Sequence, residues 1–523
     1  MSNTTTSEFS GWRAYLWPIH HHELRKLLPM LLVLFLITFD YNILRTMKDT
    51  LVVATGKASG AEVIPFIKLW VMFPGSIALT FLFTWLSNRF SRERVFYVMM
   101  TLFLSYFVFF VLVLYPWRHI LHPHEFADSL QGVLPLGMRG FISMIRNWSF
   151  TTFYVMSELW GNIVLFLLFW GFANQITQIG EAKRFYAILG IATNISGIIA
   201  GGIAVQISKT GLLSYIPYGS QPWDKQILIL VSLVVVCGAL AMIIFRWMHS
   251  HVLDEETGET VADSKGEVKG RMSMRENFKY LFNSRYLICI AIIAITYNVV
   301  INLVEVLWKY QVHTLYPDPS DYNLYMNRVM MVIGLFATVT SFGITGNLIR
   351  RAGWTFTAML TPIILLLTSI AFFGSFFYKE YLGDFSHLTF GIAPLTLVVF
   401  FGTLQNCLSR GAKYTIYDAT KEMAFVPLSQ ECKIKGKAAI DGVCIRMGKS
   451  GGSAIHQVLL LTFASLSLSA PYVAGFLLVV VAVWMGSVSS LGKQFNALTS
   501  SEDEPEPLDE AAPQPEVEPV LQG

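Results

Sequence analysis

Apolar stretches long enough to cross a lipid bilayer recur along almost the whole chain of 523 residues. A helix needs about 20 mostly apolar residues to cross the hydrocarbon core. Because 54% of the residues are hydrophobic and only 14% are charged, the composition excludes an ordinary soluble globular protein. We therefore predict an all-α polytopic membrane protein with twelve transmembrane helices, at 27–53, 64–87, 95–116, 148–176, 186–208, 226–247, 286–312, 325–349, 355–378, 391–410, 438–466 and 471–492.

Short sequence matches relate the first six spans to the last six. Tyr41-Asn42 recurs as Tyr297-Asn298, and Ser196-Gly197 recurs as Ser450-Gly451, at a similar offset along the chain. Two pseudo-symmetric halves of six helices are the layout of the major facilitator fold, which the chain resembles. The predicted domains are an N-terminal segment 1–26, a six-helix bundle 27–247, a linker 248–285, a second six-helix bundle 286–492 and an acidic tail 493–523.

The distribution of Lys and Arg predicts the orientation of the chain in the membrane. Loops such as 88–95, 177–185 and 248–285 are richer in basic residues than the alternate loops. Because basic loops stay in the cytoplasm, both termini are expected to be cytoplasmic, in an even number of spans. The Pro-rich, acidic tail is expected to be disordered.

Ionisable and polar side chains inside the predicted spans are the main candidates for function. Such residues are costly in lipid unless they are paired or wetted, so they usually face a cavity inside the protein. On a helix, Glu305 and Lys309 are spaced for an ion pair, whereas Lys48 and Lys449 have no acid one turn away. The candidates come from spans one, four, seven and eleven and are Arg45, Lys48, Glu158, Asn162, Glu305, Lys309, Asp441, Arg446 and Lys449.

These residues predict a strongly cationic central cavity that suits a polyanion such as a nucleotide polyphosphate. The expected phosphate ligands are Arg45, Lys48, Arg446 and Lys449. The expected role of Gly448, Gly451 and Gly452 is to allow close approach around these side chains. Five further residues are expected to bind substrate, to couple transport or to gate it. They are Glu158, Asn162, Glu305, Lys309 and Asp441. Any one of these charged residues could instead belong to an ion pair that only holds helices together and has no role in transport.

The tripeptide Gly448-Lys449-Ser450 resembles the end of a phosphate-binding P-loop. Five residues separate it from Gly442, however, where that motif requires four, and no soluble α/β domain surrounds it. We therefore expect no catalytic residues. The cysteines and histidines form no pattern for a metal site or cofactor. The segment 409–422 mixes basic residues with tyrosines, yet it adjoins a span and predicts a gate or surface helix rather than a nucleic-acid interface.

Five segments carry a resemblance to the ATP/ADP translocases, the nucleotide transporter family of plastids and obligate intracellular bacteria, and most of all to its chlamydial members. They are TMKDTLVV, SELWGN, NLVEVLWK, SRGAKYTIYDATKEMAFVPL and KGKAAIDGVCIRMGKSGGS. The resemblance implies antiport of external ATP for ADP with phosphate, without hydrolysis. The two six-helix halves predict alternating access, and we expect the chain to function as a monomer. Charged positions linked to transport in that family fall on Lys48, Glu158, Glu305 and Lys449.

The resemblance also bears on location, and the residues leave alternatives open. The N-terminus lacks a long extension rich in Arg and Ser, which favours a bacterial inner membrane over a plastid envelope. One alternative is a proton-coupled importer of nucleotides or other organic anions, with Glu158 and Glu305 as proton sites. Another is a membrane-embedded enzyme that uses a nucleotide.

Overall fold

The computed structural model describes residues 19–502 apart from 56–59, 178, 254–283, 344, 380–390, 429–435 and 438. Long helices account for most of the described residues, which contain no β-strand. Most of the predicted N-terminal segment, of the linker and of the acidic tail lies outside the described residues.

The first group of helices covers the first six predicted spans. Its members are α2 (Leu24–Val53), η1 (Gly60–Glu62), α3 (Val63–Phe66), η2 (Ile67–Met72), α4 (Phe73–Arg89), α5 (Arg92–Phe109), η3 (Phe110–Leu114), α6 (Arg118–Leu121), α7 (His124–Val133), η4 (Leu136–Met138), α8 (Arg139–Arg146), α9 (Trp148–Leu159), η5 (Trp160–Trp170), α10 (Gly171–Ile176), α11 (Ile179–Lys209), η6 (Gly211–Tyr215), α12 (Pro222–Met248) and η7 (His249–Leu253).

The second group covers the last six predicted spans. Its members are α15 (Arg285–Leu315), α16 (Pro319–Gly343), α17 (Thr345–Phe377), α19 (Pro394–Ala412), η8 (Lys413–Tyr417), α20 (Asp418–Ala424), η9 (Ile440–Cys444), α22 (Ile445–Phe463) and α23 (Leu466–Glu502).

Every predicted span coincides with a helical stretch, but some ends differ. The helix α23 continues to Glu502, past the predicted end at 492, so the proposed tail begins as helix. Helical structure also continues from α19 through η8 and α20, past the predicted end of the span at 410 and across the segment 409–422, for which the sequence predicts a gate or surface helix. A positive φ of 79° at Gly353 interrupts α17, which is where the sequence predicts the turn between spans eight and nine.

Nine helical stretches among the described residues are long and apolar enough to cross a membrane, judged by length and composition. The helices α16, α19 and α22, which occupy the remaining predicted spans, are not among them. Each carries polar residues that face the protein interior, including Asn327 on α16, Gln405 on α19 and His456 on α22. The polarity of these three helices therefore reflects buried contacts.

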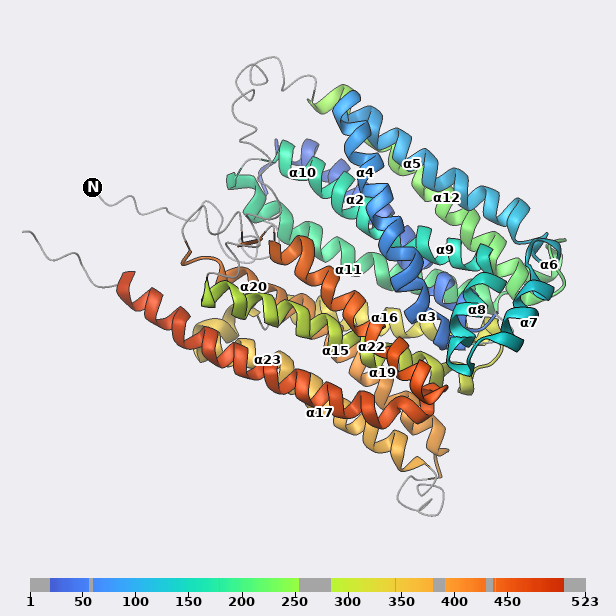
Figure 1. Ribbon diagram of the computed structural model, residues 1–523. Coiled ribbons are helices and arrows are strands. Elements are labelled where there is room, and N and C mark those ends of the chain that lie inside the picture. The colour runs from blue at the N-terminus through green and yellow to red at the C-terminus, as the bar shows by residue number, and fades with distance from the viewer. Residues whose placement is uncertain are drawn as a thin grey trace, which may run out of the picture.

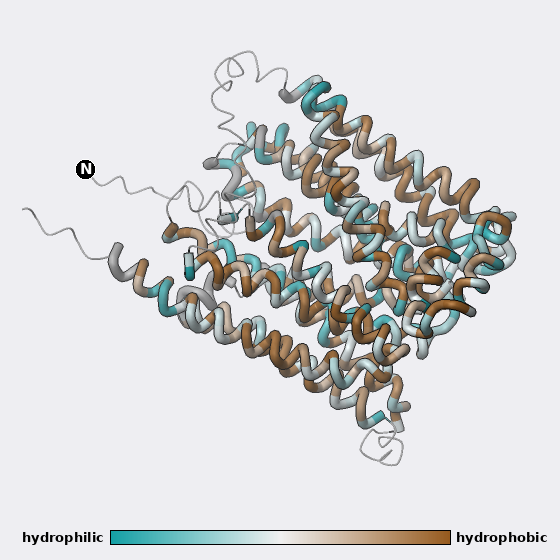
Figure 2. The backbone as a smooth tube through the Cα atoms, in the orientation of Figure 1, coloured by the Kyte–Doolittle hydropathy of each residue, from teal (hydrophilic) through white to brown (hydrophobic). Residues whose placement is uncertain are grey.

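The helices run roughly alongside one another in one bundle (Figure 1). The end of α23 lies on one side, which we call the terminal side, and the short helices α6, α7 and α8 lie on the other, which we call the opposite side. Hydrophobic residues run along much of the length of the outer helices (Figure 2), and large side chains such as Phe81 and Ile243 are exposed there. Such a surface suits contact with lipid.

The same side-chain contact joins a helix pair in each group. In the first group, Asn42 of α2 donates to Ser196 of α11, at 3.2 Å. In the second, Asn302 of α15 donates to Ser453 of α22, at 3.1 Å. In the sequence repeat, Asn42 is matched with Asn298 and Ser196 with Ser450. The second contact therefore lies about one helical turn from the matched residues.

Candidate functional site

Buried charges from α2, α9 and α15 form a continuous network, which we call the ion-pair cluster. Lys48 Nζ lies 3.1 Å from Asp49 Oδ1 and 2.9 Å from Glu158 Oε1. Lys309 Nζ lies 2.8 Å from Asp49 Oδ2 and 2.9 Å from Glu305 Oε1. The predicted pair between Glu305 and Lys309 is therefore present. Asp49 joins the two groups of helices, because it contacts a lysine from each.

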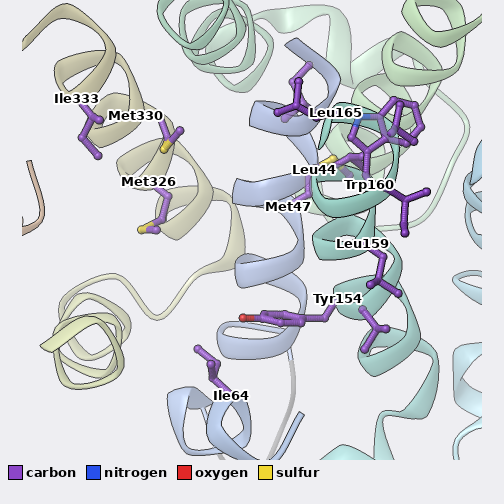
Figure 3. Packing of buried hydrophobic residues seen from close by; sticks show 14 of the residues in the cluster. Leu44, Met47, Ile64, Tyr154, Leu159, Trp160, Leu165, Met326, Met330 and Ile333 are labelled. Carbon is purple, nitrogen blue, oxygen red and sulfur yellow. The ribbon is translucent and has the colours of Figure 1, made fainter. Parts of the chain in front are cut away.

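The two lysines of the cluster are almost inaccessible to solvent. The side chains of Lys48 and Lys309 are each 2% exposed. Tyr154 extends from α9 toward α2 (Figure 3), and Lys48 Nζ lies 3.9 Å from the centre of its ring. Lys48 has no acid one turn away on its own helix, and its partners are instead the adjacent residue and a glutamate on another helix. Charges this buried require such partners.

Two cations of the network were missed in the sequence. Arg410 Nη2 lies 3.0 Å from Glu305 Oε1. Lys68 Nζ lies 3.8 Å from Glu305 Oε2 and donates to Asn302 Oδ1 at 3.1 Å. Lys68 stands inside the apolar stretch 64–87, so the rule that selected the other charges also applies to it. Arg410 stands at the predicted end of a span, where a surface position was the simpler interpretation.

Two predicted phosphate ligands lie close to the cluster without an ion pair among the described residues. The side chain of Lys449 is exposed and within electrostatic range of Glu158, Arg45 and Lys413. Arg45 is within the same range of Glu158 and Glu305. These cations therefore remain available for an anion that enters the bundle.

The other predicted site residues are placed differently. Arg446 is exposed, and no contact to the described residues places it with the cluster. Asn162 lies in η5 and makes no hydrogen bond to the described part of the chain. Asp441 pairs with Lys421, at 2.7 Å between Oδ1 and Nζ, and so joins η9 to α20 away from the cluster. A gating role for Asp441 remains a prediction.

Several site residues lie in π-helical segments. Lys68 is in η2, Asn162 in η5, Lys413 in η8 and Asp441 in η9. A π-helical segment places side chains out of the regular α-helical register, and such segments occur frequently at functional sites. Of these four residues, Lys68 is the one whose side chain contacts Glu305 and Asn302.

Hydrogen bonds between the two groups close the bundle toward the opposite side. Near the end of α2 and the start of α16, Thr50 pairs with Asn323 and Thr46 with Asn327, at 3.3 and 3.0 Å. Gln457 of α22 donates to the carbonyl oxygen of Pro65, at 2.9 Å. Thr46 and Thr50 flank Lys48 and Asp49 on α2, so these two contacts lie at the level of the cluster. Lys449 and Tyr414 are both exposed, Tyr414 by 46%.

The glycines around Lys449 serve helix packing more than phosphate approach. A Cβ on Gly448 would lie 2.7 Å from the carbonyl oxygen of Ile295, and one on Gly452 would lie 3.0 Å from Asn302 Cβ. A Cβ on Gly451 would meet nothing within 4 Å. The expectation that all three glycines admit phosphate is therefore wrong for Gly448 and Gly452. Gly448 also lies inside a regular helix, which is no setting for a P-loop.

Alanine at Gly448 is expected to destabilise the protein, whereas alanine at Gly451 is not. The added methyl group at Gly448 would overlap the backbone of α15, and such overpacking typically costs about 1–3 kcal/mol. Gly451 lies in the same helix and gains helix propensity from the same substitution. Thermal unfolding of the two purified variants in detergent measures the difference. Equal melting temperatures would contradict the assigned packing.

Comparisons with known proteins agree with this architecture. Residues 2–495 match the family model described as TLC ATP/ADP transporter. The chain is 44% identical over 505 residues to "ADP,ATP carrier protein 1" of Chlamydia muridarum (strain MoPn / Nigg), covering 96% of this chain and 95% of that protein. It is 40% identical over 482 residues to "ADP,ATP carrier protein 1, chloroplastic" of Arabidopsis thaliana, covering 92% and 75%.

Solved structures resemble the fold at low sequence identity. One is a bacterial homologue of the iron transporter ferroportin in an inward-facing state, with a TM-score of 0.53, 13% identity, and coverage of 92% of this chain and 100% of that one. Another is the partially occluded inward-open xylose transporter XylE from E. coli, with a TM-score of 0.51, 13% identity, and coverage of 94% and 100%. These likenesses confirm the predicted fold class, an all-α membrane protein with a major-facilitator-like arrangement of helices.

Proposed function

Since the chain belongs to the TLC ATP/ADP transporter family, we propose that it exchanges ATP for ADP across a membrane by alternating access and hydrolyses neither nucleotide. The observation that carries the proposal is the excess of positive charge between the two groups of helices. Six cations (Arg45, Lys48, Lys68, Lys309, Arg410 and Lys449) lie with three acids (Asp49, Glu158 and Glu305), which leaves 6 − 3 = +3.

This excess suits the phosphates of a nucleotide. ADP and ATP carry roughly three and four negative charges when their terminal phosphate, with a pKa of about 6, is ionised. Lys449 and Arg45 are the first expected ligands, because neither has an ion-pair partner to give up among the described residues. Lys48 would bind phosphate only after it leaves Glu158 or Asp49. Arg446 would join the site from the exposed face of α22.

During alternating access, the bundle would open on one side of the membrane as it closes on the other. The two six-helix bundles, 27–247 and 286–492, would rock around the bound nucleotide. Opening toward the opposite side has to break the contact between Asp49 and Lys309 and the one between Lys68 and Glu305, because each joins the two groups. An anion that binds these lysines offers them a replacement for their acids. Substrate binding would thereby favour the conformational change.

Further parts of the proposal concern the membrane and the exchanged ions. Phosphate accompanies ADP, the chain works as a monomer, and both termini face the cytoplasm of a bacterial inner membrane. The alternation of basic and neutral loops supports the orientation. With that orientation the terminal side would be cytoplasmic.

The alternative of proton-coupled import gains no support from its predicted proton sites. Glu158 and Glu305 both contact lysines at 2.9 Å, and Glu305 also contacts Arg410. Such partners stabilise the charged carboxylates, so these glutamates are poor carriers of a proton unless the ion pairs break.

Counterflow decides between exchange and coupled import. Proteoliposomes preloaded with ADP are expected to take up labelled ATP, and empty ones to take up almost none, because exchange requires a counter-substrate. A protonophore should leave the uptake unchanged. Liposomes without protein and preloading with a sugar serve as controls. Uptake into empty liposomes that a protonophore abolishes would refute the proposal.

A further inference from the structure

One acid of α2 lies apart from the ion-pair cluster and has no polar partner. Asp40 is 0% exposed, and neither of its carboxyl oxygens makes a hydrogen bond to the described residues. By contrast, Asp49 on the same helix contacts two lysines. The two aspartates therefore stand in opposite environments, although they are a few turns apart.

The surroundings of Asp40 are apolar. On a helix with 3.6 residues per turn, Ile37 and Leu44 share its face, and both are 0% exposed. Leu44 turns from α2 toward η5, where Trp160 packs (Figure 3), and the indole Nε1 of Trp160 donates to the carbonyl oxygen of Ile37. That bond leaves the indole nitrogen with no hydrogen to offer Asp40.

No described charged group compensates a negative charge at this position. The elements that pack against α2 are η1, α3, α9, η5, α11, α12, α15 and α16. Among the described residues of these elements, the thiol of Cys237 on α12 is the titratable group within electrostatic range of Asp40. The described lysines, arginines and histidines do not approach it. Lys48, which is two turns along α2, is paired to Asp49 and Glu158.

An ionised carboxylate in such a place is strongly disfavoured. Burying an unpaired ion in an apolar medium costs several kcal/mol even after the protein relaxes, and more without water or a hydrogen-bond donor. Binding a proton removes the charge and leaves the smaller cost of a buried neutral group. We propose that Asp40 is a proton-binding site and that its carboxyl group is a neutral acid in this conformation.

The proposal assigns the proton to a residue other than the two glutamates selected from the sequence. It does not depend on nucleotide exchange, because it rests on the contacts of α2 with η5 and α12 inside the first group of helices. A proton held there moves with that group as a whole, unless the contact between α2 and α12 opens.

Infrared spectroscopy of the purified full-length protein tests the proposal directly. A protonated carboxyl group has a C=O stretching band that is separate from the bands of carboxylates and of the amide backbone. At neutral pH, the unmodified protein is expected to show such a band, and Asp40→Asn, which is similar in shape and neutral, is expected to lose it. Asp49→Asn is the matched control, because an ion-paired aspartate contributes no such band, so this variant should keep the band of Asp40.

The outcomes separate the two states of Asp40. Loss of a protonated-acid band in Asp40→Asn and its retention in Asp49→Asn support the proposal. Loss of carboxylate absorption in Asp40→Asn, or no protonated-acid band in the unmodified protein, overturns it. If Asp40→Asn does not fold, Asp40→Leu gives the same difference spectrum, since an apolar side chain suits this face. The absence of a protonated-acid band from the spectrum of the unmodified protein would overturn the proposal even without a folded variant.

Discussion

Replacing Lys449 with alanine is expected to weaken nucleotide exchange by about ten- to a hundredfold in apparent affinity, with little change in thermal stability. The side chain is exposed and has no ion pair among the described residues, so folding loses little, typically within about 0.5 kcal/mol for such a position. A charge-assisted hydrogen bond to phosphate contributes about 1.5–3 kcal/mol, and every 1.4 kcal/mol corresponds to a factor of about ten. Exchange in proteoliposomes and unfolding in detergent measure the two effects separately.

The matched control is Lys493→Ala. Lys493 is also an exposed lysine on a long helix, α23, but it lies outside the cluster. Both its exchange and its melting temperature should resemble those of the unmodified protein. Normal exchange by Lys449→Ala would exclude Lys449 as a phosphate ligand. A melting temperature that falls together with exchange would show that Lys449 acts through folding instead.

Replacing Lys48 with methionine is expected to lower the free energy of unfolding by about 3–5 kcal/mol. Removing one member of a buried ion pair leaves an uncompensated buried charge, and this is the usual size of the penalty. Here Glu158 would lose its partner at 2.9 Å, whereas Asp49 would keep Lys309. Methionine retains most of the volume of the lysine stem, so the loss reports on charge more than on a cavity. Thermal unfolding measures it.

Two further variants separate charge from packing at Lys48. Adding Glu158→Gln to Lys48→Met removes the stranded acid and should restore part of the lost stability. Lys413→Met is the matched control, because Lys413 pairs with Asp418 at 3.1 Å while their side chains are 32% and 40% exposed. An exposed pair contributes at most about 1 kcal/mol. If Lys48→Met and Lys413→Met lowered the free energy of unfolding equally, burial would not determine how much breaking the ion pair destabilises the protein.

Periodicity and charge cost predicted much of the fold and part of the site. The apolar stretches located all twelve helical positions, and the spacing of Glu305 and Lys309 predicted their contact, because both follow from local helix geometry. The same reasoning applies to Lys68 as well, although it was overlooked. Arg410 was not distinguishable, because nothing local shows that the helix it ends continues into η8 and α20.

The repeat shows the limit of matching residues along the chain. Asn42 contacts Ser196, but in the second group the similar contact is made by Asn302 and not by Asn298, the residue that the sequence matches with Asn42. Gly448 and Gly452, next to the expected ligand Lys449, pack against α15. Both outcomes depend on the rotation of one helix against its neighbour, and neighbouring helices can pack in more than one register.

The sequence by itself determined that the chain crosses a membrane as helices and that a few charges lie within them, because lipid leaves a polypeptide few other solutions. Only the tertiary structure decided which charges neutralise one another. Lys48 and Lys449 look alike as single lysines in apolar stretches, yet the first is paired on two sides and the second is exposed. The physical reason is that an ion pair acts over a few ångströms, so its partners are set by how distant helices pack.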